Sequence, residues 1–136
     1  MKGVVLLVIT IDTVSPTPIY MQLRNQVVLG IASRQLETGE ALPSARRLSA
    51  DLGINLHTVN KSYTLLSDEG YIATDRRKGT FISHPVKSVK EIKSMLSEKL
   101  RLAAAEAICH SVNSDEFIDL CLSNFNKIQN NFMEGK

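Results

Sequence analysis

The chain of 136 residues contains no tryptophan, only two cysteines, four prolines and 5% aromatic residues. So few aromatic side chains disfavour a platform on which the bases of single strands or sugar rings would stack. Cys109 and Cys121 form neither a CxxC motif nor a cluster with histidines, so we expect two half-buried reduced thiols and no structural zinc. The three histidines are widely scattered, and we predict neither a metal site nor a cofactor.

Long hydrophobic runs are also missing. The run Gly3–Ile9 is far shorter than the ~20 apolar residues that span a bilayer. Asp12 interrupts it, and no small-residue cleavage site of a signal peptide follows. Because β-branched residues dominate the run, we predict a strand within residues 1–17. We expect a cytoplasmic protein without membrane contact.

The chain as a whole has no strong excess of positive or negative charge, since its formal net charge is only +2. The surplus lies in residues 41–85, which carry six basic and four acidic side chains, whereas the segments before and after are balanced. Five of the six cations lie at two places, Arg46–Arg47 and Arg76–Lys78. A local basic surplus of this kind favours a nucleic-acid partner more than the small total does.

The first helix is predicted from apolar spacing. Ile19, Leu23, Val27 and Ile31 recur every four residues and give one apolar face. Proline is tolerated in the first turn of a helix, so the helix is predicted to run from Pro18 to about Arg34, where the stripe has ended.

Two further helices are predicted from their caps. Ser44 is a good N-cap for a short second helix, and Gly53 permits the left-handed backbone of the tight turn after it. Asn55 is the N-cap candidate of a third helix that stops near Gly70.

The segments Tyr71–Thr74 and Thr80–Ser83 are typical of strands, and the basic turn Asp75–Gly79 between them predicts a hairpin. Three helices followed by a basic hairpin are the pattern of a winged helix-turn-helix. In that fold the third helix enters the major groove, and its N-terminal residues face the base edges.

The residues predicted to face DNA lie at the start of the second helix, at the start of the third helix and at the hairpin tip. The planar fork of Arg46 suits a bidentate contact with phosphate or guanine, and the amide of Asn60 suits adenine, with an ordinary surface residue as the equal alternative for Asn60. Ser44 is also explained by capping alone. The full set is Ser44, Arg46, Arg47, Asn55, Leu56, His57, Thr58, Asn60, Lys61, Arg77, Lys78, Gly79 and Thr80.

Residues 88–132 contain neither glycine nor proline and predict two amphipathic helices. Ser88 and Glu91 form a capping box for the first helix, and Ser114 is expected to cap the second. Two helices cannot bury both apolar stripes alone, so we expect a homodimer, with packing onto the chain's own first domain as the alternative. The stripes are Val89, Ile92, Leu96, Leu100, Ala103 and Ala107, then Phe117, Cys121, Phe125, Ile128 and Phe132.

Many spaced residues between positions 9 and 84 resemble the GntR family of transcriptional regulators. The remaining ~50 residues are similar to the short two-helix extension of the YtrA subgroup, and a strand at Ile9–Asp12 would also resemble that subgroup. The resemblance implies a cytosolic homodimeric repressor on a palindromic operator, often of a transporter operon. It rests on Pro18–Tyr20, Gln22–Leu23, Gly39–Ser44, Arg46, Leu48, Leu52–Asn55, Thr58–Lys61, Tyr63, Glu69–Ile72 and Lys78–Ile82.

Three residues depart from the pattern of that family. Arg34 stands where glycine often closes the first helix, and we expect little effect from this change. Leu56 stands where polar or basic residues are common, and we expect it to alter base preference. Arg77 occupies a wing position that is often glycine, and it adds a charge that attracts phosphate at a tighter turn.

We therefore predict a mostly α protein with a small β wing: an N-terminal strand and lead-in over residues 1–17, a winged helix-turn-helix DNA-binding domain over 18–85, and an α-helical dimerisation extension over 86–136. No nucleophile–base pair, paired-carboxylate motif or glycine-rich phosphate loop favours an enzyme. A protein-interaction module that uses the winged helix as a docking surface is the alternative. The sequence neither names nor rules out a small-molecule effector.

Overall fold

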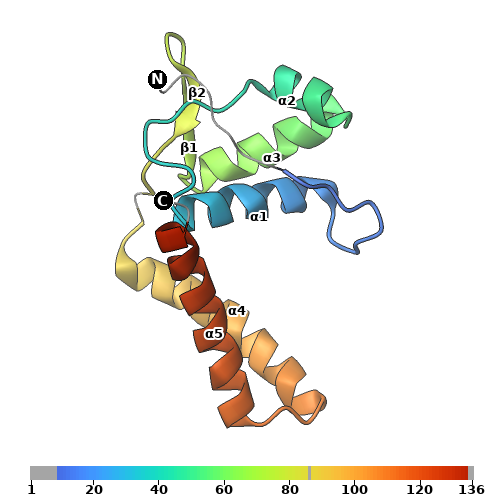
Figure 1. Cartoon of the computed structure of the whole chain (residues 1–136), viewed down its shortest axis with the longest axis vertical. Helices are drawn as coiled ribbons and strands as arrows, with labels where there is room; N and C mark the ends of the chain where they lie inside the picture. Colours follow the sequence, from blue (N-terminus) through green and yellow to red (C-terminus); the bar gives the residue numbers. More distant parts are fainter. Residues whose placement is uncertain (1–8, 86, 135–136) are drawn as a thin grey trace. The chain divides into compact units, whose positions relative to one another are not determined.

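The computed structural model describes residues 9–85 and 87–134, and the chain divides into two compact units after Pro85. Among these residues, every helix is too short or too polar to span a lipid bilayer. The first unit holds three helices and a two-stranded sheet, and the second unit holds two long helices (Figure 1). In chain order they are α1 (Ile19–Ala32), α2 (Ala45–Leu52), α3 (Leu56–Asp68), β1 (Ile72–Asp75), β2 (Gly79–Ile82), α4 (Val89–Cys109) and α5 (Ser114–Glu134).

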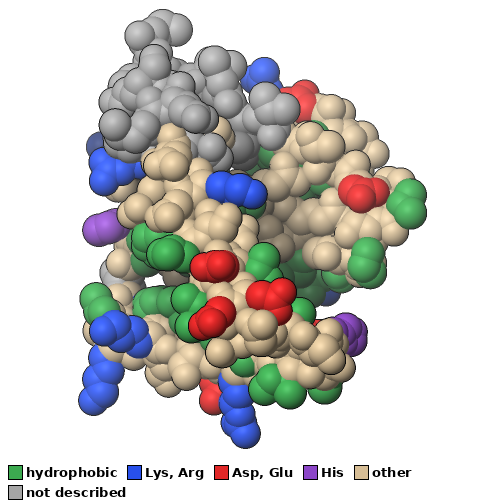
Figure 2. All heavy atoms as spheres, turned by 60° about the horizontal axis from the view of Figure 1, so that its bottom comes forward, with side chains coloured by type: hydrophobic (Ala, Val, Ile, Leu, Met, Phe, Trp, Pro, Cys, Tyr) green, Lys and Arg blue, Asp and Glu red, His purple; other side chains and the backbone are tan. Residues whose placement is uncertain are grey.

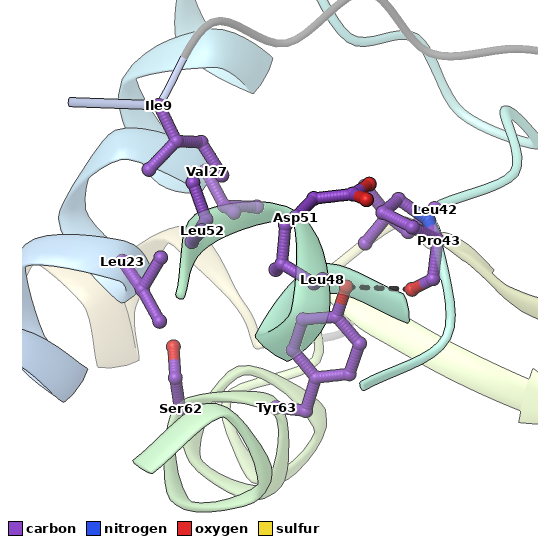
Figure 3. Close-up of a pocket in the computed structure, with 10 residues that line it drawn as sticks. All are labelled: Ile9, Leu23, Val27, Leu42, Pro43, Leu48, Asp51, Leu52, Ser62 and Tyr63. Atoms are coloured by element: carbon purple, nitrogen blue, oxygen red, sulfur yellow. Dashed lines mark hydrogen bonds between the residues drawn. The ribbon is translucent and has the colours of Figure 1, made fainter. Parts of the chain in front are cut away.

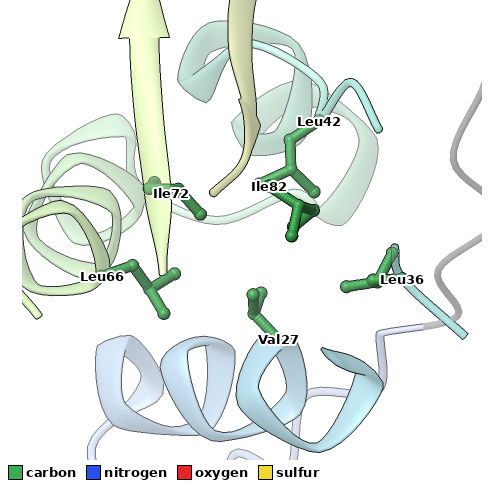
Figure 4. Close-up of a cluster of buried hydrophobic side chains, with 6 residues drawn as sticks. All are labelled: Val27, Leu36, Leu42, Leu66, Ile72 and Ile82. Atoms are coloured by element: carbon green, nitrogen blue, oxygen red, sulfur yellow. The ribbon is translucent and has the colours of Figure 1, made fainter. Parts of the chain in front are cut away.

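Helix α3 is the centre of the first unit, because it packs against α1, α2 and β1. Leu23, Leu48 and Val59 form a small buried cluster that joins the three helices. A larger cluster ties the helices to the hairpin (Figure 4), and each fully buried aliphatic side chain in it contributes roughly 1.5–3 kcal/mol to folding. It consists of Val27, Leu36, Leu42, Leu66, Ile72 and Ile82.

The predicted caps of the helix-turn-helix are confirmed. The Ser44 hydroxyl accepts a hydrogen bond from the Arg47 N–H at 3.1 Å, and the Asn55 side chain accepts one from the His57 N–H at 2.7 Å. Gly53 ends α2 in the left-handed conformation, with φ of 66°. These local signals fix where α2 and α3 begin and how the chain turns between them.

Replacing Gly53 with alanine is expected to lower the free energy of unfolding by about 1 kcal/mol. A Cβ at this position would meet no atom of the described residues within 4 Å, so the cost comes from the left-handed backbone. Urea denaturation measures the loss. Gly53→Asn is the matched control, because asparagine adopts this conformation more readily and should lose less stability. An alanine variant as stable as the parent would contradict the expectation.

Helix α1 ends at Ala32, two residues before the predicted end. Arg34 then adopts a φ of 61°, and its N–H donates to the carbonyl oxygen of Ile31 at 3.1 Å. For a residue other than glycine this conformation costs roughly 1–2 kcal/mol. We expected little effect from an arginine at this position, where the related family often has glycine. The left-handed backbone of Arg34 shows instead that the arginine carries a conformational cost that glycine would not.

Residues 9–12 form no strand, contrary to the prediction; the rest of the predicted strand, residues 1–8, lies outside the described residues. The segment is instead held by two glutamine side chains of α1. The Gln26 amide exchanges hydrogen bonds of 3.0 and 2.7 Å with the backbone of Thr10. The Gln22 amide does the same with Asp12, at 2.9 Å in both directions.

The spacing of the two glutamines explains this match. Residues four apart in a helix are separated by about 6 Å along the axis, and two residues of extended chain span about 6.6 Å. Two amides one turn apart can therefore bond two alternate peptide groups. Side chains of α1 thus form the backbone hydrogen bonds that a neighbouring strand would form, and the strand that the YtrA-like resemblance suggested at Ile9–Asp12 is absent.

The hairpin lies where it was predicted, with each strand displaced by one residue. Asp75 pairs with Gly79 across the turn, and Ile72 pairs with Ile82 at the other end. The loop before α2 lies along β2, because Leu42 N–H donates to Thr80 O and Ile82 N–H donates to Glu40 O, both at 2.8 Å. The hairpin is therefore fixed to the base of α2.

A second link joins α1 to the end of α3. The guanidinium group of Arg24 donates to both carboxylate oxygens of Glu69, at 2.9 and 3.2 Å, and lies 5.7 Å from the centre of the Tyr71 ring. Both charged side chains are largely shielded from solvent. No sequence pattern pointed to this pair, because 45 residues separate its members.

In the second unit, the capping box of α4 is confirmed by hydrogen bonds of 3.2 Å in both directions between Ser88 and Glu91. The predicted cap of α5 is wrong, because Asn113 caps the helix and Ser114 is its first residue. Asn113 and Glu116 form a reciprocal pair at 2.9 and 3.0 Å. A glutamate follows three residues after Asn113 but not three after Ser114, and this partner decides the cap.

Candidate nucleic-acid interface

The start of α3 presents a polar outer face. His57, Asn60 and Lys61 are exposed, and Thr64 continues the same face one turn later. Val59, Ser62 and Leu66 point the other way and are buried. Leu56 and Thr58, also predicted to contact DNA, are half-buried at the edge of this face. Thr64 was missed by the sequence reasoning, although helical spacing from His57 would have found it.

The start of α2 carries two exposed arginines. Arg47 forms an ion pair of 3.7 Å with Asp51, in which both side chains are well exposed, and a pair of this kind contributes about 0–1 kcal/mol. Within the described residues, Arg46 has no ion-pair partner. Both guanidinium groups are thus available to a ligand at little cost.

The hairpin tip is shaped by one carboxylate. Asp75 Oδ1 accepts hydrogen bonds from the backbone N–H groups of Arg77, at 2.6 Å, and Lys78, at 3.3 Å. Gly79 then takes a φ of 74°, which a side chain would resist. The turn leaves the side chains of Arg76, Arg77 and Lys78 exposed together. An acid in the basic wing therefore serves the backbone geometry that presents the cations.

The wing turn is expected to loosen in acid. The hydrogen bond from the Arg77 N–H, with a second from Lys78, holds the pKa of Asp75 below its usual range. Its contribution to the turn is complete above the unfolded-state pKa of ~4 and is lost as the pH falls through the lower folded-state value. Amide resonances of Arg77 and Lys78, followed from about pH 6 to about pH 2, should shift together.

The control for this titration is Asp75→Ala, whose spectrum should already show the acid-form shifts at neutral pH. If the two amides in the parent chain keep their positions throughout the titration, the carboxylate does not organise the turn.

Some predicted site residues already have partners within the chain. The side chains of Ser44 and Asn55 are engaged as caps. The ammonium group of Lys61 lies 4.1 Å from the centre of the Tyr20 ring on α1. That of Lys78 lies 5.7 Å from the Phe81 ring. Both lysines remain exposed, so an aromatic ring holds each cation without covering it.

The three groups of residues belong to one unit. Helix α1 lies on one side of α3, α2 lies on the other, and the hairpin tip projects on the α2 side (Figure 1). The outer face of α3, the first turn of α2 and the wing tip are the parts that the winged helix-turn-helix pattern assigned to DNA.

Comparison with known proteins decides the family. The model of "Bacterial regulatory proteins, gntR family" matches residues 18–82, which hold α1 to α3 and the hairpin. The HTH-type transcriptional repressor YtrA of Bacillus subtilis is 37% identical over 101 residues, covering 73% of this chain and 78% of the relative. The chain belongs to the gntR family of bacterial regulatory proteins.

Two solved structures share the fold of this chain, and one of them is itself a GntR-family protein. YtrA from Sulfolobus acidocaldarius, a GntR-family transcription factor, is 38% identical with a TM-score of 0.61, over 71% of this chain and 97% of that one. A transcriptional antiterminator from Listeria monocytogenes is 29% identical with a TM-score of 0.80, over 88% and 91%. The predicted mostly α winged helix-turn-helix with a two-helix extension is confirmed.

This GntR-family chain is therefore a YtrA-like, DNA-binding transcription regulator, and its relatives are regulators rather than enzymes.

Proposed function

We propose that the chain is a homodimeric repressor in which residues 18–85 bind DNA, residues 86–136 dimerise and residues 1–17 lead into the first helix. The observation that carries the DNA site is the outer face of α3, which is free of acids up to Asp68 and belongs to the same unit as the exposed cations of α2 and of the wing. Carboxylates would be repelled by the phosphate backbone, so a face without them suits the major groove.

Each part of the surface has a proposed role. His57, Thr58 and Asn60 read base edges together with Arg46, and Leu56 offers an apolar contact to a thymine methyl group. Arg47, Lys61, Arg77 and Lys78 bind phosphates, while Gly79 and Thr80 let the wing backbone approach the duplex closely. Ser44 and Asn55 hold the helix starts, and the backbone N–H groups there face the phosphates.

The second copy is proposed because many apolar side chains of the second unit are exposed, while Ile92, Ala103, Ala107, Phe117 and Ile128 of the proposed interface are half-buried. No side chain of α4 is buried, and hydrophobic side chains are open to the surface in Figure 2. Leu96 is 48% exposed and Phe125 is 62% exposed. Patches of this kind on a monomer mark interaction sites. The proposed interface contains Val89, Ile92, Leu96, Leu100, Ala103, Ala107, Phe117, Cys121, Phe125 and Ile128; the side chain of Phe132 lies outside the described residues.

The exposed faces of the second unit also explain why the predicted burial of the two cysteines is wrong. Cys109 and Cys121 are exposed in the single chain, not half-buried. Since Cys121 belongs to the proposed interface, its burial would come only from the partner copy.

A symmetric dimer presents two recognition helices, so its operator is a palindrome with half-sites one helical turn, or a multiple of it, apart. We propose repression because the Bacillus relative is a repressor, and transporter genes as targets because the YtrA-like resemblance implies them. A protein that binds its operator acts where the DNA is, which for a bacterial regulator is the cytoplasm.

A gel-shift titration against the chain's own promoter region, repeated over a series of salt concentrations, tests the DNA site. The logarithm of the association constant should fall linearly with the logarithm of salt, by about 0.9 per phosphate contact. Absent or salt-insensitive binding would contradict the proposal and favour the winged helix as a protein-docking surface. Regulation that survives Arg46→Ala together with Lys78→Ala would favour the same alternative.

A further inference from the structure

The first unit contains a cavity of about 150 Å³ where α1, α2 and α3 meet (Figure 3). Its walls come from both hydrophobic clusters, with Leu23 and Leu48 from the small one and Val27 and Leu42 from the large one. The two clusters therefore leave a space between them instead of closing on each other. The space is not sealed, because exposed Asp51 and half-buried Ile9 and Leu52 also line it.

One polar group in the cavity wall has no partner. Ser62, on the inner face of α3, is completely buried, and its hydroxyl oxygen forms no hydrogen bond with any described residue. In Figure 3 the hydroxyl points into the space between α3 and the side chains of Leu23 and Leu52. A buried hydroxyl without a partner costs about 1–3 kcal/mol, and a ligand in the cavity would remove that cost.

The other polar groups of the wall restrict the ligand. The Tyr63 hydroxyl is already engaged, because it donates to the carbonyl oxygen of Pro43 at 2.7 Å, and burial raises the pKa of this phenol. The carboxylate of Asp51 is exposed and repels anions from the mouth of the cavity. Because Asp51 is exposed, solvent screens its charge and no cation is required in the cavity. The remaining walls are aliphatic.

We propose that this cavity binds a small neutral molecule that is apolar except for one hydroxyl group, which hydrogen-bonds to Ser62. An aliphatic cavity of this volume has room for one six-membered ring. Half-buried Ile9 and Leu52 line the outer part of the cavity, and small movements of their side chains would let the molecule in. Phenol has the matching size and the single hydroxyl group, and it serves as the probe.

Binding here would act on the DNA-binding surface. The cavity is lined by Leu48 and Leu52 of α2 and by Ser62 and Tyr63 of α3, and these two helices carry Arg46 and the outer face of α3. A ring wedged between them stabilises a wider separation, and by linkage it lowers operator affinity by about fivefold or more. This effect rests on the proposed function, whereas the binding site itself does not.

The site is tested by titrating the full-length ¹⁵N-labelled chain with phenol and, as the matched ligand without a hydroxyl, with benzene. Both should cause saturable shifts at the amides of Leu23, Leu48 and Ser62, and phenol should bind about fivefold more tightly, as expected for one hydrogen bond. Ser62→Ala keeps the space but removes the hydroxyl, so it should abolish the preference for phenol and still bind benzene.

Several outcomes would overturn the site: no saturable shifts at the cavity, equal binding of phenol and benzene by the parent chain, or a preference for phenol that survives in Ser62→Ala. Leu52→Phe serves as a second variant if Ser62→Ala does not fold, because it fills the cavity from its half-buried rim and should abolish both titrations. Bound ligand that leaves the gel shift unchanged would overturn the coupling alone. Absent operator binding by the ligand-free chain would overturn the proposed function and leave the site intact.

Discussion

Replacing Arg46 with alanine is expected to weaken operator binding by about 1–3 kcal/mol, a roughly 5- to 150-fold rise in Kd. Arg46 is exposed in the first turn of α2 and has no ion-pair partner within the described residues, so its guanidinium group is ready for a bidentate contact with DNA. Because no ion pair among the described residues is lost, the stability of the chain should change little. Fluorescence anisotropy with a labelled operator measures the affinity, and urea denaturation measures the stability.

The matched control is Arg101→Ala, which removes an exposed arginine from α4 in the second unit. It changes the net charge by the same amount but lies outside the proposed DNA surface, so its affinity should stay within about twofold of the parent. If the two variants lose affinity equally, the loss comes from the change in net charge, and Arg46 makes no specific contact with DNA. The slope of affinity against salt should also become shallower by about one unit in Arg46→Ala if the contact is to phosphate.

Replacing Phe125 with aspartate is expected to raise the dissociation constant of the dimer by roughly 100-fold or more, equivalent to about 3 kcal/mol. Phe125 is 62% exposed in the single chain, so the variant loses little within its own fold. In the proposed dimer the same position is covered, and a carboxylate would be buried there without a partner. Sedimentation equilibrium should show the variant at the monomer mass of 15.0 kDa.

Asn126→Asp supplies the matched control. It introduces the same carboxylate one residue along α5, where helical geometry turns the side chain about 100° away from the apolar stripe. It should stay dimeric at the concentrations where Phe125→Asp is monomeric. A dimer that survives Phe125→Asp would move the interface elsewhere and favour packing of the stripes within one chain. Loss of the dimer should also weaken operator binding, because the two half-sites are then bound independently.

Local signals account for the parts of the fold that were predicted well. Ser44, Gly53 and Asn55 act within one turn of their own positions, and the structure has the caps and the left-handed turn where the sequence placed them. Asn113 and Ser114 are both possible N-caps of α5, and the reciprocal hydrogen bonds with Glu116 select Asn113. Glu116 stands three residues after Asn113 in the sequence, so the correct cap of α5 could have been predicted.

Features that join distant parts of the chain were beyond sequence reasoning. The contact of Lys61 with Tyr20, like the pair of Arg24 with Glu69, depends on how α1 packs against α3. The cavity beside Ser62 depends on small gaps between two clusters, and no spacing pattern encodes a gap. The positions of the candidate DNA residues were easier to predict, because these residues lie at the starts of elements whose caps and turns are local; that they bind DNA stays a prediction.

The two glutamines of α1 that hold residues 10–12 have an evolutionary consequence. Gln22 and Gln26 bond to peptide groups, which every amino acid except proline offers in full. The side chain of Thr10 can therefore change among related regulators while its docking is preserved. Each glutamine must both donate and accept, so even glutamate, which matches its shape, would lose half of the exchange. In such lineages we expect the anchors to persist while the anchored segment diverges.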